Sequence, residues 1–318
     1  MGSVVILGVF NADTTYRAAR QPRIGETLAG LDFALGPGGK GSNQSVAAAK
    51  AGALVHFLTR LGRDAFADMA RAIWAEAGVV PEVAEDAESH TGAAFIFVED
   101  ATGDNAIIIA PGAGGRISIA DIEARAALIA GAAVFVTQLE QPLDAALRAL
   151  RIARAGGSTT ILNPAPAARL PEGMLALCDY VTPNETEAEL LTGLPVTSLA
   201  EARAAAESIR AAGAGAVILT LGAQGALFHD GAQSTLVPAF DAGPVAETTG
   251  AGDAFNGGFA AALARGMAPL DAVRFGCAAA AISVTRAGAA ASMPGREEIE
   301  ALLARGNSVR GSGSRGSR

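Results

Sequence analysis

Cysteine, histidine and aromatic residues are all scarce in this chain of 318 residues. The two cysteines, Cys178 and Cys277, stand far apart and outside any C-x-x-C spacing, so neither a disulfide framework nor a zinc site is indicated. The three histidines, His56, His90 and His229, stand in no metal-binding motif. Because two isolated cysteines fit a reducing compartment, we expect a cytoplasmic protein.

Basic residues and long apolar runs are also in short supply. Lys and Arg number 24 against 32 Asp and Glu, which gives a formal net charge of −8 and disfavours non-specific binding to nucleic acid or to an anionic membrane. No segment reaches the ~18 consecutive apolar residues that a membrane span needs. The first apolar run, residues 4–10, has no basic lead, so it predicts a buried strand rather than a signal peptide. We therefore expect neither a nucleic acid nor a membrane partner.

Strand-like and helix-like segments alternate through most of the chain. Half of the residues are apolar, with alanine and glycine prominent, which suits close packing of helices on a sheet. The alternation predicts a parallel sheet covered by helices on both faces, in one domain over residues 1–305. A broken stretch over residues 12–36 predicts strands lying off the main core, and the two apolar runs AAFIFVED and NAIIIAPG, joined by ATGD, predict a hairpin. Residues 306–318 lack apolar periodicity and predict a disordered tail.

Several polar residues come at or just after the ends of apolar strand-like runs. In a parallel sheet the carboxyl ends of the strands lie at one edge, where ligands gather. We therefore expect the glycine-rich loop at Gly250 to join a crevice that is lined by Asn11, Glu140, Asn163, Asn184 and Gly222.

The run ETTGAGDAFNGGF, residues 247–259, places one aspartate, Asp253, in front of an apolar helix. A carboxylate in a first helical turn is stabilised by the helix dipole, so a structural cap explains this residue by itself. The small residues Gly250, Ala251 and Gly252 also leave backbone N–H groups accessible to an anion as large as a phosphate. The run therefore has two interpretations, a helix cap and an anion cradle with a proton acceptor on its rim.

A second glycine-rich run, GPGGKGSNQ, precedes another helix. It is not a Walker A sequence, because Gly41 rather than Ser or Thr follows Lys40. One interpretation is a glycine turn that feeds a helix with Ser42 or Asn43 as its N-cap. In the other, Gly39 lets the backbone approach a small ligand, and Lys40 and Asn43 bind the hydroxyl groups of that ligand.

The run TPNETEAELLTG, residues 182–193, has Asn184 and Glu187 three positions apart at the start of a helix. This spacing predicts a variant of the capping box, in which Asn184 caps the helix and Glu187 reaches back to it. The same pair can also organise a hydrated magnesium ion, which prefers oxygen ligands and keeps several of its waters. The two interpretations are compatible, since one pair can serve both purposes.

The order of the motifs along the chain is more specific than any one of them. Up to about Ile299 the chain contains, in sequence, NAD, GGKGSNQ, QLE, NPAPA, TPNETEAE, TLGAQG, TTGAGDAFNGGF and VTRAGAAASMP. In this order the motifs resemble the PfkB family of carbohydrate kinases, and within it the ribokinases. The resemblance implies a ribokinase-like α/β fold, a three-layer α/β/α (Rossmann-like) core with a small β-sheet lid near 12–36 and 92–110. In ribokinases this lid is also a dimer contact, so we expect a homodimer.

The resemblance implies a role for each motif. Asp253 would take the proton from the primary hydroxyl group of a sugar as this group attacks ATP, while the cradle's N–H groups, at Gly250, Ala251 and Gly252, stabilise the phosphoryl charge. The sugar would be bound by Asn11, Asp13, Gly39, Lys40, Asn43 and Glu140. ATP would be bound by Asn184, Thr220, Gly222, Gly225 and Gly252. Magnesium would be held, through water, by Asn184 and Glu187.

The acid at position 247 departs from the family pattern. Ribokinases usually have aspartate here, where it helps to bind an activating potassium ion beside the anion cradle. Glu247 keeps the charge but is longer by one methylene, so we expect activation by a monovalent cation to persist in weakened form. The resemblance implies that the other contributors to this cation site are Thr249, Ser283, Arg286, Gly288 and Ser292.

Three functions are compatible with these motifs. The first is phosphorylation of D-ribose to ribose 5-phosphate with ATP. The second is the same chemistry on deoxyribose, a ketohexose or a nucleoside, although an aromatic content of 5% offers little to stack a nucleoside base. The third is a non-catalytic sugar or nucleotide sensor. The retention of Asp253 argues against a sensor, because binding alone needs no base.

Overall fold

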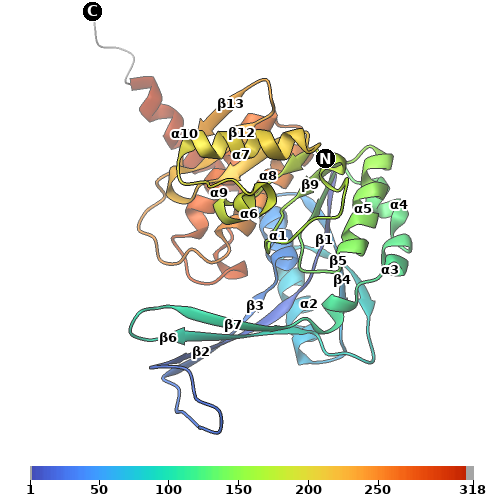
Figure 1. Cartoon of the computed structure of the whole chain (residues 1–318), viewed down its shortest axis with the longest axis vertical. Helices are drawn as coiled ribbons and strands as arrows, with labels where there is room; N and C mark the ends of the chain where they lie inside the picture. Colours follow the sequence, from blue (N-terminus) through green and yellow to red (C-terminus); the bar gives the residue numbers. More distant parts are fainter. Residues whose placement is uncertain (1, 313–318) are drawn as a thin grey trace, which may run out of the picture.

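The larger of two β-sheets forms the centre of the molecule. The computed structural model describes residues 2–312, and side chains within residues 2–305. Within these residues a nine-stranded sheet and a four-stranded sheet lie in separate regions (Figure 1). The strand order of the larger sheet, from edge to edge, is β13 (Ser234–Val237), β12 (Ala226–His229), β11 (Ala216–Thr220), β10 (Tyr180–Val181), β9 (Thr159–Leu162), β8 (Val134–Thr137), β1 (Ser3–Leu7), β4 (Leu54–Leu61) and β5 (Val80–Glu85).

Both faces of the larger sheet are apolar and buried. Eight of its nine strands run in one direction, and β12 runs opposite to them, pairing antiparallel with both β11 and β13. Successive residues of a strand point to opposite faces, so in β1 Val4 and Ile6 join one core while Val5 and Leu7 join the other. All four side chains are almost completely buried. A parallel sheet of this kind needs helices on both sides to exclude water.

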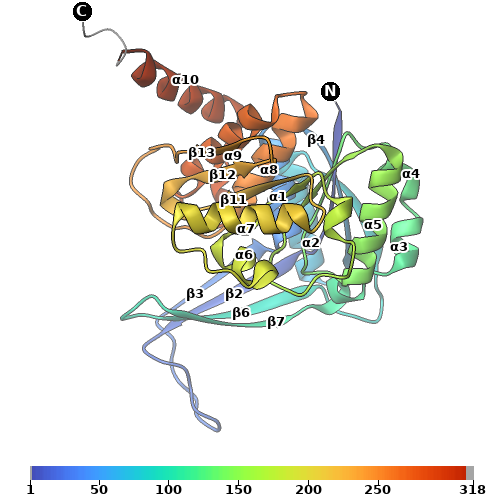
Figure 2. The same ribbon diagram turned by 45° about the horizontal axis from the view of Figure 1, so that its top comes forward.

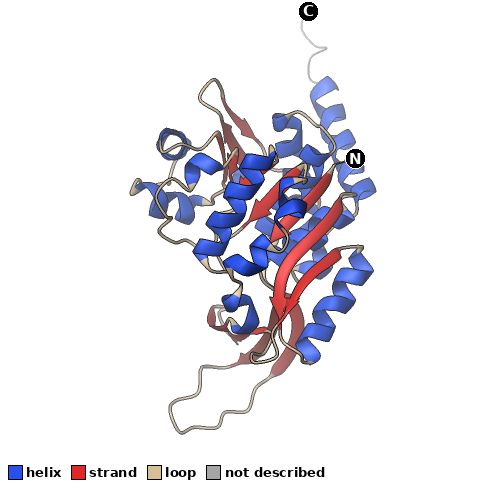
Figure 3. Cartoon of the chain, turned by 90° about the vertical axis from the view of Figure 1, so that its right-hand side faces the viewer, coloured by secondary structure: helices blue, strands red, loops and turns tan. Residues whose placement is uncertain are grey.

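Helices cover both faces, which confirms the predicted three-layer α/β/α core (Figure 3). One face packs against α1 (Lys40–Lys50), α2 (Ala65–Ala77), α8 (Ala251–Ala264), α9 (Pro269–Ser283) and α10 (Arg296–Ser312). The other packs against α3 (Ile119–Glu123), α4 (Ala126–Ala130), α5 (Leu143–Gly156), α6 (Glu185–Thr192) and α7 (Leu199–Ala211). Short 3₁₀ helices add η1 (Gly112–Arg116), η2 (Leu175–Leu177), η3 (Gly222–Gln224) and η4 (Ala290–Ser292). None of the helices in the described part of the chain is long and apolar enough to cross a membrane.

The smaller sheet projects from one end of the core (Figures 1 and 2). Its strand order is β3 (Asp32–Gly38), β2 (Asn11–Ala18), β6 (Gly92–Glu99) and β7 (Asn105–Ala110). These strands come from the two segments near 12–36 and 92–110 that the sequence placed outside the main core, and they form the predicted lid sheet. The hairpin of β6 and β7 is antiparallel, as its turn signal predicts.

The register of the lid sheet places two polar residues of β2 on one face and an aromatic group on the other. Asn11 and Asp13 lie on one face of β2. The opposite face carries Tyr16, whose ring centroid lies 5.1 Å from that of Phe33 and 5.5 Å from that of Phe95. These three rings are substantially exposed. The face of Asn11 and Asp13 also carries Ile107 and Ile109 of β7, while the opposite face presents an uncovered group of aromatic side chains.

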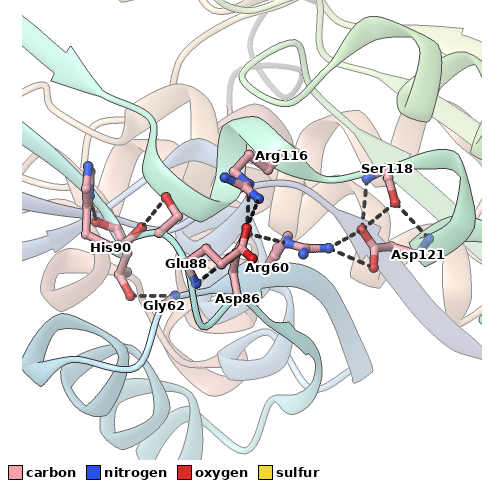
Figure 4. A network of polar contacts seen from close by, with 10 residues as sticks. Arg60, Gly62, Asp86, Glu88, His90, Arg116, Ser118 and Asp121 are labelled. Carbon is pink, nitrogen blue, oxygen red and sulfur yellow. Dashed lines mark hydrogen bonds and ion pairs between the residues drawn. The ribbon is translucent and has the colours of Figure 1, made fainter.

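A cluster of charged side chains fixes the roots of the β6–β7 hairpin to the core (Figure 4). The carboxylate of Asp86, 2% exposed, accepts a hydrogen bond from Nε of Arg60 at 3.0 Å and pairs with Nε of Arg116 at 2.9 Å. Arg60 also donates to Asp121 at the start of α3. Arg60 ends β4, Asp86 follows β5 just before β6, and Arg116 follows β7, so the cluster ties both ends of the hairpin to one strand of the large sheet.

The C-terminal helix reaches beyond the predicted end of the domain. α10 runs to Ser312 and so includes part of the segment 306–318, which the sequence predicts to be a disordered tail. Residues 313–318 lie outside the described residues. Disorder of this segment stays a prediction.

Candidate active site

Asp253 lies buried where the first turns of two helices meet. α8 begins after Gly250, whose φ of 79° is in the left-handed region that favours glycine. Asp253 is 7% exposed. Its Oδ2 accepts a hydrogen bond from Nδ2 of Asn43 at 3.0 Å, and its Oδ1 accepts one from Nε2 of Gln44 at 3.0 Å. The two glycine-rich motifs are therefore in contact through this carboxylate.

The start of α1 differs from the predicted N-cap at Ser42 or Asn43. The cap residue is Gly39, with a φ of 87°, and a Cβ there would lie 2.5 Å from the carbonyl oxygen of Val9. Because the helix begins three residues earlier than a Ser42 cap requires, Ser42 and Asn43 are inside it. The Ser42 hydroxyl instead accepts a hydrogen bond from the Trp74 indole at 2.9 Å. The cap prediction is wrong, and Asn43 is free to contact Asp253.

Lys40 is surrounded by carboxylates. Its backbone N–H donates to Oε2 of Glu140 at 2.7 Å. Burial lowers the pKa of Lys40, but attraction to Asp253, Glu140 and Glu187 outweighs burial, so the pKa is raised and the ammonium group stays charged. Removal from water raises the pKa of Glu140 to about 7 and that of Asp13 to about 6. Several acidic side chains therefore lie around one positive charge, the ammonium group of Lys40.

A cavity of about 170 Å³ extends from Lys40 and Asp253 toward α6. It confirms that Asn163, Asn184 and the Gly250 loop share one crevice. The remaining residues that line it are Ala165, Thr182, Glu187, Thr220, Thr248, Ala251, Gly252 and Asn256. Asn11 and Glu140 lie at the neighbouring Lys40 end rather than in its lining. The loop residues Gly222 and Gly225 follow Thr220 at η3 and do not line this cavity, contrary to the expectation for Gly222.

The predicted capping box at α6 is confirmed. Oδ1 of Asn184 accepts a hydrogen bond from the N–H of Glu187 at 2.8 Å, and Oε2 of Glu187 accepts one from the N–H of Asn184 at 2.9 Å. Glu187 is 8% exposed and lines the cavity, and burial raises its pKa. The pair therefore presents buried oxygen atoms to the cavity in addition to capping the helix.

The loop that carries the anion cradle is held by a backbone hydrogen bond and by two side chains for which the sequence analysis named no role. The N–H of Ala251 donates to the carbonyl of Thr248 at 3.2 Å. The carbonyl of Gly252 accepts a hydrogen bond from Nδ2 of Asn256 at 2.8 Å, and Oδ1 of Asn256 accepts one from the Thr182 hydroxyl at 2.6 Å. The spacing of Gly252 and Asn256, four residues in a helix, is a signal that could have identified Asn256. Thr182 begins the run TPNETEAELLTG, but no local pattern indicates its contact with Asn256, which lies 74 residues away.

Four buried amide oxygens have no protein partner. Within the described side chains, Oδ1 of Asn11 and of Asn43 and Oε1 of Gln138 and of Gln141 are buried and accept no hydrogen bond. Of these side chains, Asn43 is the one that also bonds to Asp253. A buried acceptor without a partner is costly, so native sites of this kind normally meet a donor from a ligand or from water. Hydroxyl groups are donors of the required type.

Glu247 is already engaged in a hydrogen bond within the predicted cation site. Oε2 of Glu247 accepts a hydrogen bond from the N–H of Gly288 at 2.8 Å. The carbonyl of Ser283 accepts the N–H of Arg286 at 3.1 Å, and the Ser292 hydroxyl donates to the carbonyl of Ala289. Thr249 comes four residues before Asp253, in the loop that precedes α8. The described residues contain no cluster of three or more His, Cys, Asp or Glu side chains that could hold a metal ion.

The site combines a buried carboxylate at a helix N-terminus, a charged lysine and buried amide oxygens that have no hydrogen-bond donor within the protein. This combination fits a phosphotransferase that acts on a hydroxylated substrate. The chain belongs to the PfkB family of carbohydrate kinases, since the model of the pfkB carbohydrate kinase family matches residues 1–296. It is accordingly an ATP-dependent carbohydrate kinase.

Individual relatives cover almost the whole chain. A ribokinase from Haemophilus influenzae is 39% identical over 302 residues, which are 95% of this chain and 98% of the relative. A deoxyribokinase from Salmonella typhi is 37% identical over 302 residues, with 94% and 98% covered. The structure of Arabidopsis thaliana ribokinase complexed with ribose and ATP is similar, with a TM-score of 0.89, 30% identity and coverage of 95% of this chain and 98% of that one.

The raised pKa of Glu140 predicts a pH-dependent cost to stability. Between the ordinary glutamate value of 4.5 and about 7, the folded chain keeps a proton at Glu140 that the unfolded chain has released, so stability falls as pH rises through this window. Glu140→Gln keeps an acceptor for the Lys40 N–H and removes the titration. We expect the variant to gain about 1–3 kcal/mol over wild type between pH 4.5 and pH 7–8.

Urea unfolding at pH 5 and pH 8 measures this gain. Glu172→Gln, at an exposed glutamate, is the matched control and should show no such change with pH. Equal free energies of unfolding for Glu140→Gln and wild type at both pH values would show that Glu140 is not strained in the folded chain.

Proposed function

We propose that this protein transfers the γ-phosphoryl group of ATP to the primary hydroxyl group of D-ribose, giving ribose 5-phosphate and ADP. The observation that carries the proposal is the unpartnered, buried Oδ1 of Asn43, whose amide nitrogen donates to the buried base Asp253, together with the unpartnered, buried Oδ1 of Asn11. Asp13, Lys40 and the other sugar-binding residues named from the resemblance surround the same region. The ribokinases among the relatives favour ribose.

Asp253 serves as the general base in this proposal. It takes the proton of the primary hydroxyl group as the hydroxyl oxygen forms a bond to the γ-phosphorus, and the bond from that phosphorus to the β,γ-bridging oxygen breaks to release ADP. N–H groups of Gly250, Ala251 and Gly252 and the dipole of α8 stabilise the charge on the transferring group. Positioning and charge stabilisation contribute most to phosphoryl transfer.

The 170 Å³ cavity between Asp253 and α6 is the proposed place for the ATP phosphates. Asn184, Thr220 and Gly252 line it, while Gly222 and Gly225 are proposed to contact the nucleotide further out. Asn184 and Glu187 would hold Mg²⁺ through its water shell, and the buried, partly desolvated carboxylate of Glu187 fits this role. When bound, the ion would neutralise phosphate charge.

We infer that potassium activation is present but weakened. The proposed ligands are the carboxylate of Glu247, carbonyl oxygens near Thr249, Ser283, Arg286 and Gly288, and Ser292. The longer side chain of Glu247 reaches the N–H of Gly288 and is engaged there at 2.8 Å. A carboxylate oxygen held by this hydrogen bond is less available to a cation.

We propose a homodimer formed through the apolar face of the lid sheet. Tyr16, Phe33, Leu35, Phe95 and Ile108 share this face by register, and each is at least 36% exposed. The core clusters that bury the two faces of the large sheet contain none of these five side chains. A second copy would cover this surface with the same residues, which is the symmetry that a two-fold interface requires.

We also propose that the protein works in the cytoplasm. Cys178 and Cys277 are free thiols buried on different helical layers, and burial raises the pKa of both to about 12. Neither is placed to form a disulfide, which fits a reducing compartment.

The substrate and the base are tested together by ADP release. With ATP and Mg²⁺, we expect turnover on D-ribose to exceed that on deoxyribose, fructose and adenosine. Asp253→Asn should keep sugar and ATP binding, measured by calorimetry, and lose about 10²–10⁴-fold in kcat because no base remains. The same amide change at Asp13→Asn is the matched control and should mainly raise KM for the sugar.

Preference for deoxyribose would keep the mechanism and reassign the sugar, as the deoxyribokinase relatives allow. Near wild-type turnover of Asp253→Asn would remove Asp253 from its role as base.

The cation proposal is tested by titrating KCl against kcat in wild type and Glu247→Asp. The shorter aspartate cannot keep the hydrogen bond to Gly288 without moving the loop, so its carboxylate is released toward the cation. We expect a severalfold larger activation by potassium in the variant. Equal and strong activation of both proteins would contradict the effect assigned to Glu247.

The lid interface is tested by sedimentation velocity on Ile108→Glu. A charge on the apolar face should convert the dimer to a monomer, because a buried unpaired carboxylate is costly. Ile107→Glu, on the next residue and the opposite face of β7, is the matched control and should remain dimeric. A dimeric Ile108→Glu, or a monomeric wild type, would contradict the lid interface.

A further inference from the structure

A chain of buried side-chain amides runs to Asp253 from the carboxyl ends of two strands. Nε2 of Gln44 donates both to Oδ1 of Asp253 at 3.0 Å and to Oδ1 of Asn163 at 3.1 Å. Oε1 of Gln44 accepts a hydrogen bond from Nε2 of Gln138 at 2.6 Å. Gln44 and Gln138 are completely buried, and Asn163 is 7% exposed. The four side chains come from α1, α8 and the ends of β8 and β9.

The chain of amides has only one consistent direction. Nδ2 of Asn163 donates to the backbone carbonyl of Thr182 at 3.0 Å, and a carbonyl can only accept. Oδ1 of Asn163 must therefore face Gln44 and accept from it. The nitrogen of the Gln44 amide consequently points at Asp253, while the oxygen points at Gln138. The Thr182 carbonyl thus fixes the orientation of Gln44 through the side chain of Asn163.

The position of Gln44 is otherwise suited to an apolar residue. Val46, Ala47 and Ala48 on the same helix belong to the hydrophobic core. Burying an uncharged amide there is costly unless each polar atom has a partner, and in Gln44 each one does. Among these partners, Asp253 is the one to which the proposed function assigns a chemical role.

Charges of both signs face Asp253 and favour opposite ionisation states of its carboxyl group. Lys40 on α1 attracts the carboxylate, whereas Glu140 after β8 and Glu187 on α6 repel it. Asp13 on β2 adds a further acid beside Glu140. Each N–H that points at the carboxylate of Asp253 favours its charged form.

We propose that Gln44 is a positioning residue for phosphoryl transfer: its amide N–H holds Oδ1 of Asp253, which keeps the carboxylate ionised and leaves Oδ2, on the Asn43 side, directed at the sugar hydroxyl group. The proposal rests on the proposed function, in which Asp253 is the base. It assigns to the Gln138–Gln44–Asn163 chain the task of keeping that base ready to accept a proton.

The ionisation behaviour of Asp253 agrees with this arrangement. Burial raises its pKa, while Lys40, Asn43 and Gln44 each act to lower it. Loss of the Gln44 donor should raise the pKa further. Since only the ionised carboxylate can accept the proton, the acidic limb of the pH profile of kcat/KM should then move to higher pH.

The test uses Gln44→Met, which keeps the side-chain length and removes the donor. We expect the acidic limb of kcat/KM for D-ribose to move up by about one pH unit, since a hydrogen bond to a charged group is worth about one pKa unit or more. The matched control is Gln141→Met. Gln141 is also buried, and it bonds to Thr137 and to the carbonyl of Gln138 but not to Asp253. The acidic limb of kcat/KM should therefore stay in place in Gln141→Met.

A lower rate at every pH with an unmoved acidic limb in Gln44→Met would reduce Gln44 to a packing residue and overturn the proposal. An equal displacement in Gln141→Met would do the same.

A second readout depends neither on turnover nor on a variant at position 44. In wild type, the side-chain amide protons of Gln44 should shift in NMR spectra as Asp253 titrates, and this titration should vanish in Asp253→Asn. A pH-independent Gln44 amide beside a titrating Asp253 would overturn the positioning role. Absence of sugar phosphorylation by wild type would instead overturn the proposed function and leave this measurement intact.

Discussion

The proposed chemistry depends on one carboxylate that must ionise although it is removed from water, because burial raises the pKa of Asp253. Asp253 lies at the N-terminus of α8 and faces the first turn of α1, so two helix dipoles and the amides of Asn43 and Gln44 converge on it. The helices must approach closely to do this. Gly257 of α8 permits the approach, because a Cβ there would lie 2.5 Å from Cβ of Ala47 on α1. Small residues in the helical layer thus have a direct consequence for the chemistry.

The carboxylates around Lys40 show the cost of assembling such a site. Glu140, Asp13 and Glu187 all have raised pKa values because they are partly or fully removed from water, and only one lysine lies among them. Without a ligand these groups oppose folding rather than favour it, which is common where function requires a particular set of charges. Sugar hydroxyl groups and a hydrated cation would provide the partners that the folded chain itself does not supply.

The lid sheet assigns different tasks to its two faces. The side-chain period of two places Asn11 and Asp13 on the face toward Lys40 and leaves Tyr16 and its aromatic neighbours on the other. The salt-bridge cluster of Arg60, Asp86 and Arg116 ties the hairpin roots to the core, so movement of the lid would have to arise beyond these roots. The proposed sugar contacts and the proposed dimer interface therefore lie on opposite faces of one sheet.

The sequence by itself determined the alternating α/β core, the lid segments, the glycine-rich loops and the capping box of Asn184 and Glu187, because these follow from periodicity, backbone freedom and contacts three or four residues apart. The chain order of the motifs also sufficed to indicate the family. Tertiary structure decided where α1 begins, since the close approach of Val9 to Gly39 sets the cap, and which amides reach Asp253. Gln138 and Asn163 lie 94 and 119 residues away from Gln44 along the chain, and only the packing of α1 over the ends of β8 and β9 brings them within hydrogen-bonding distance of it.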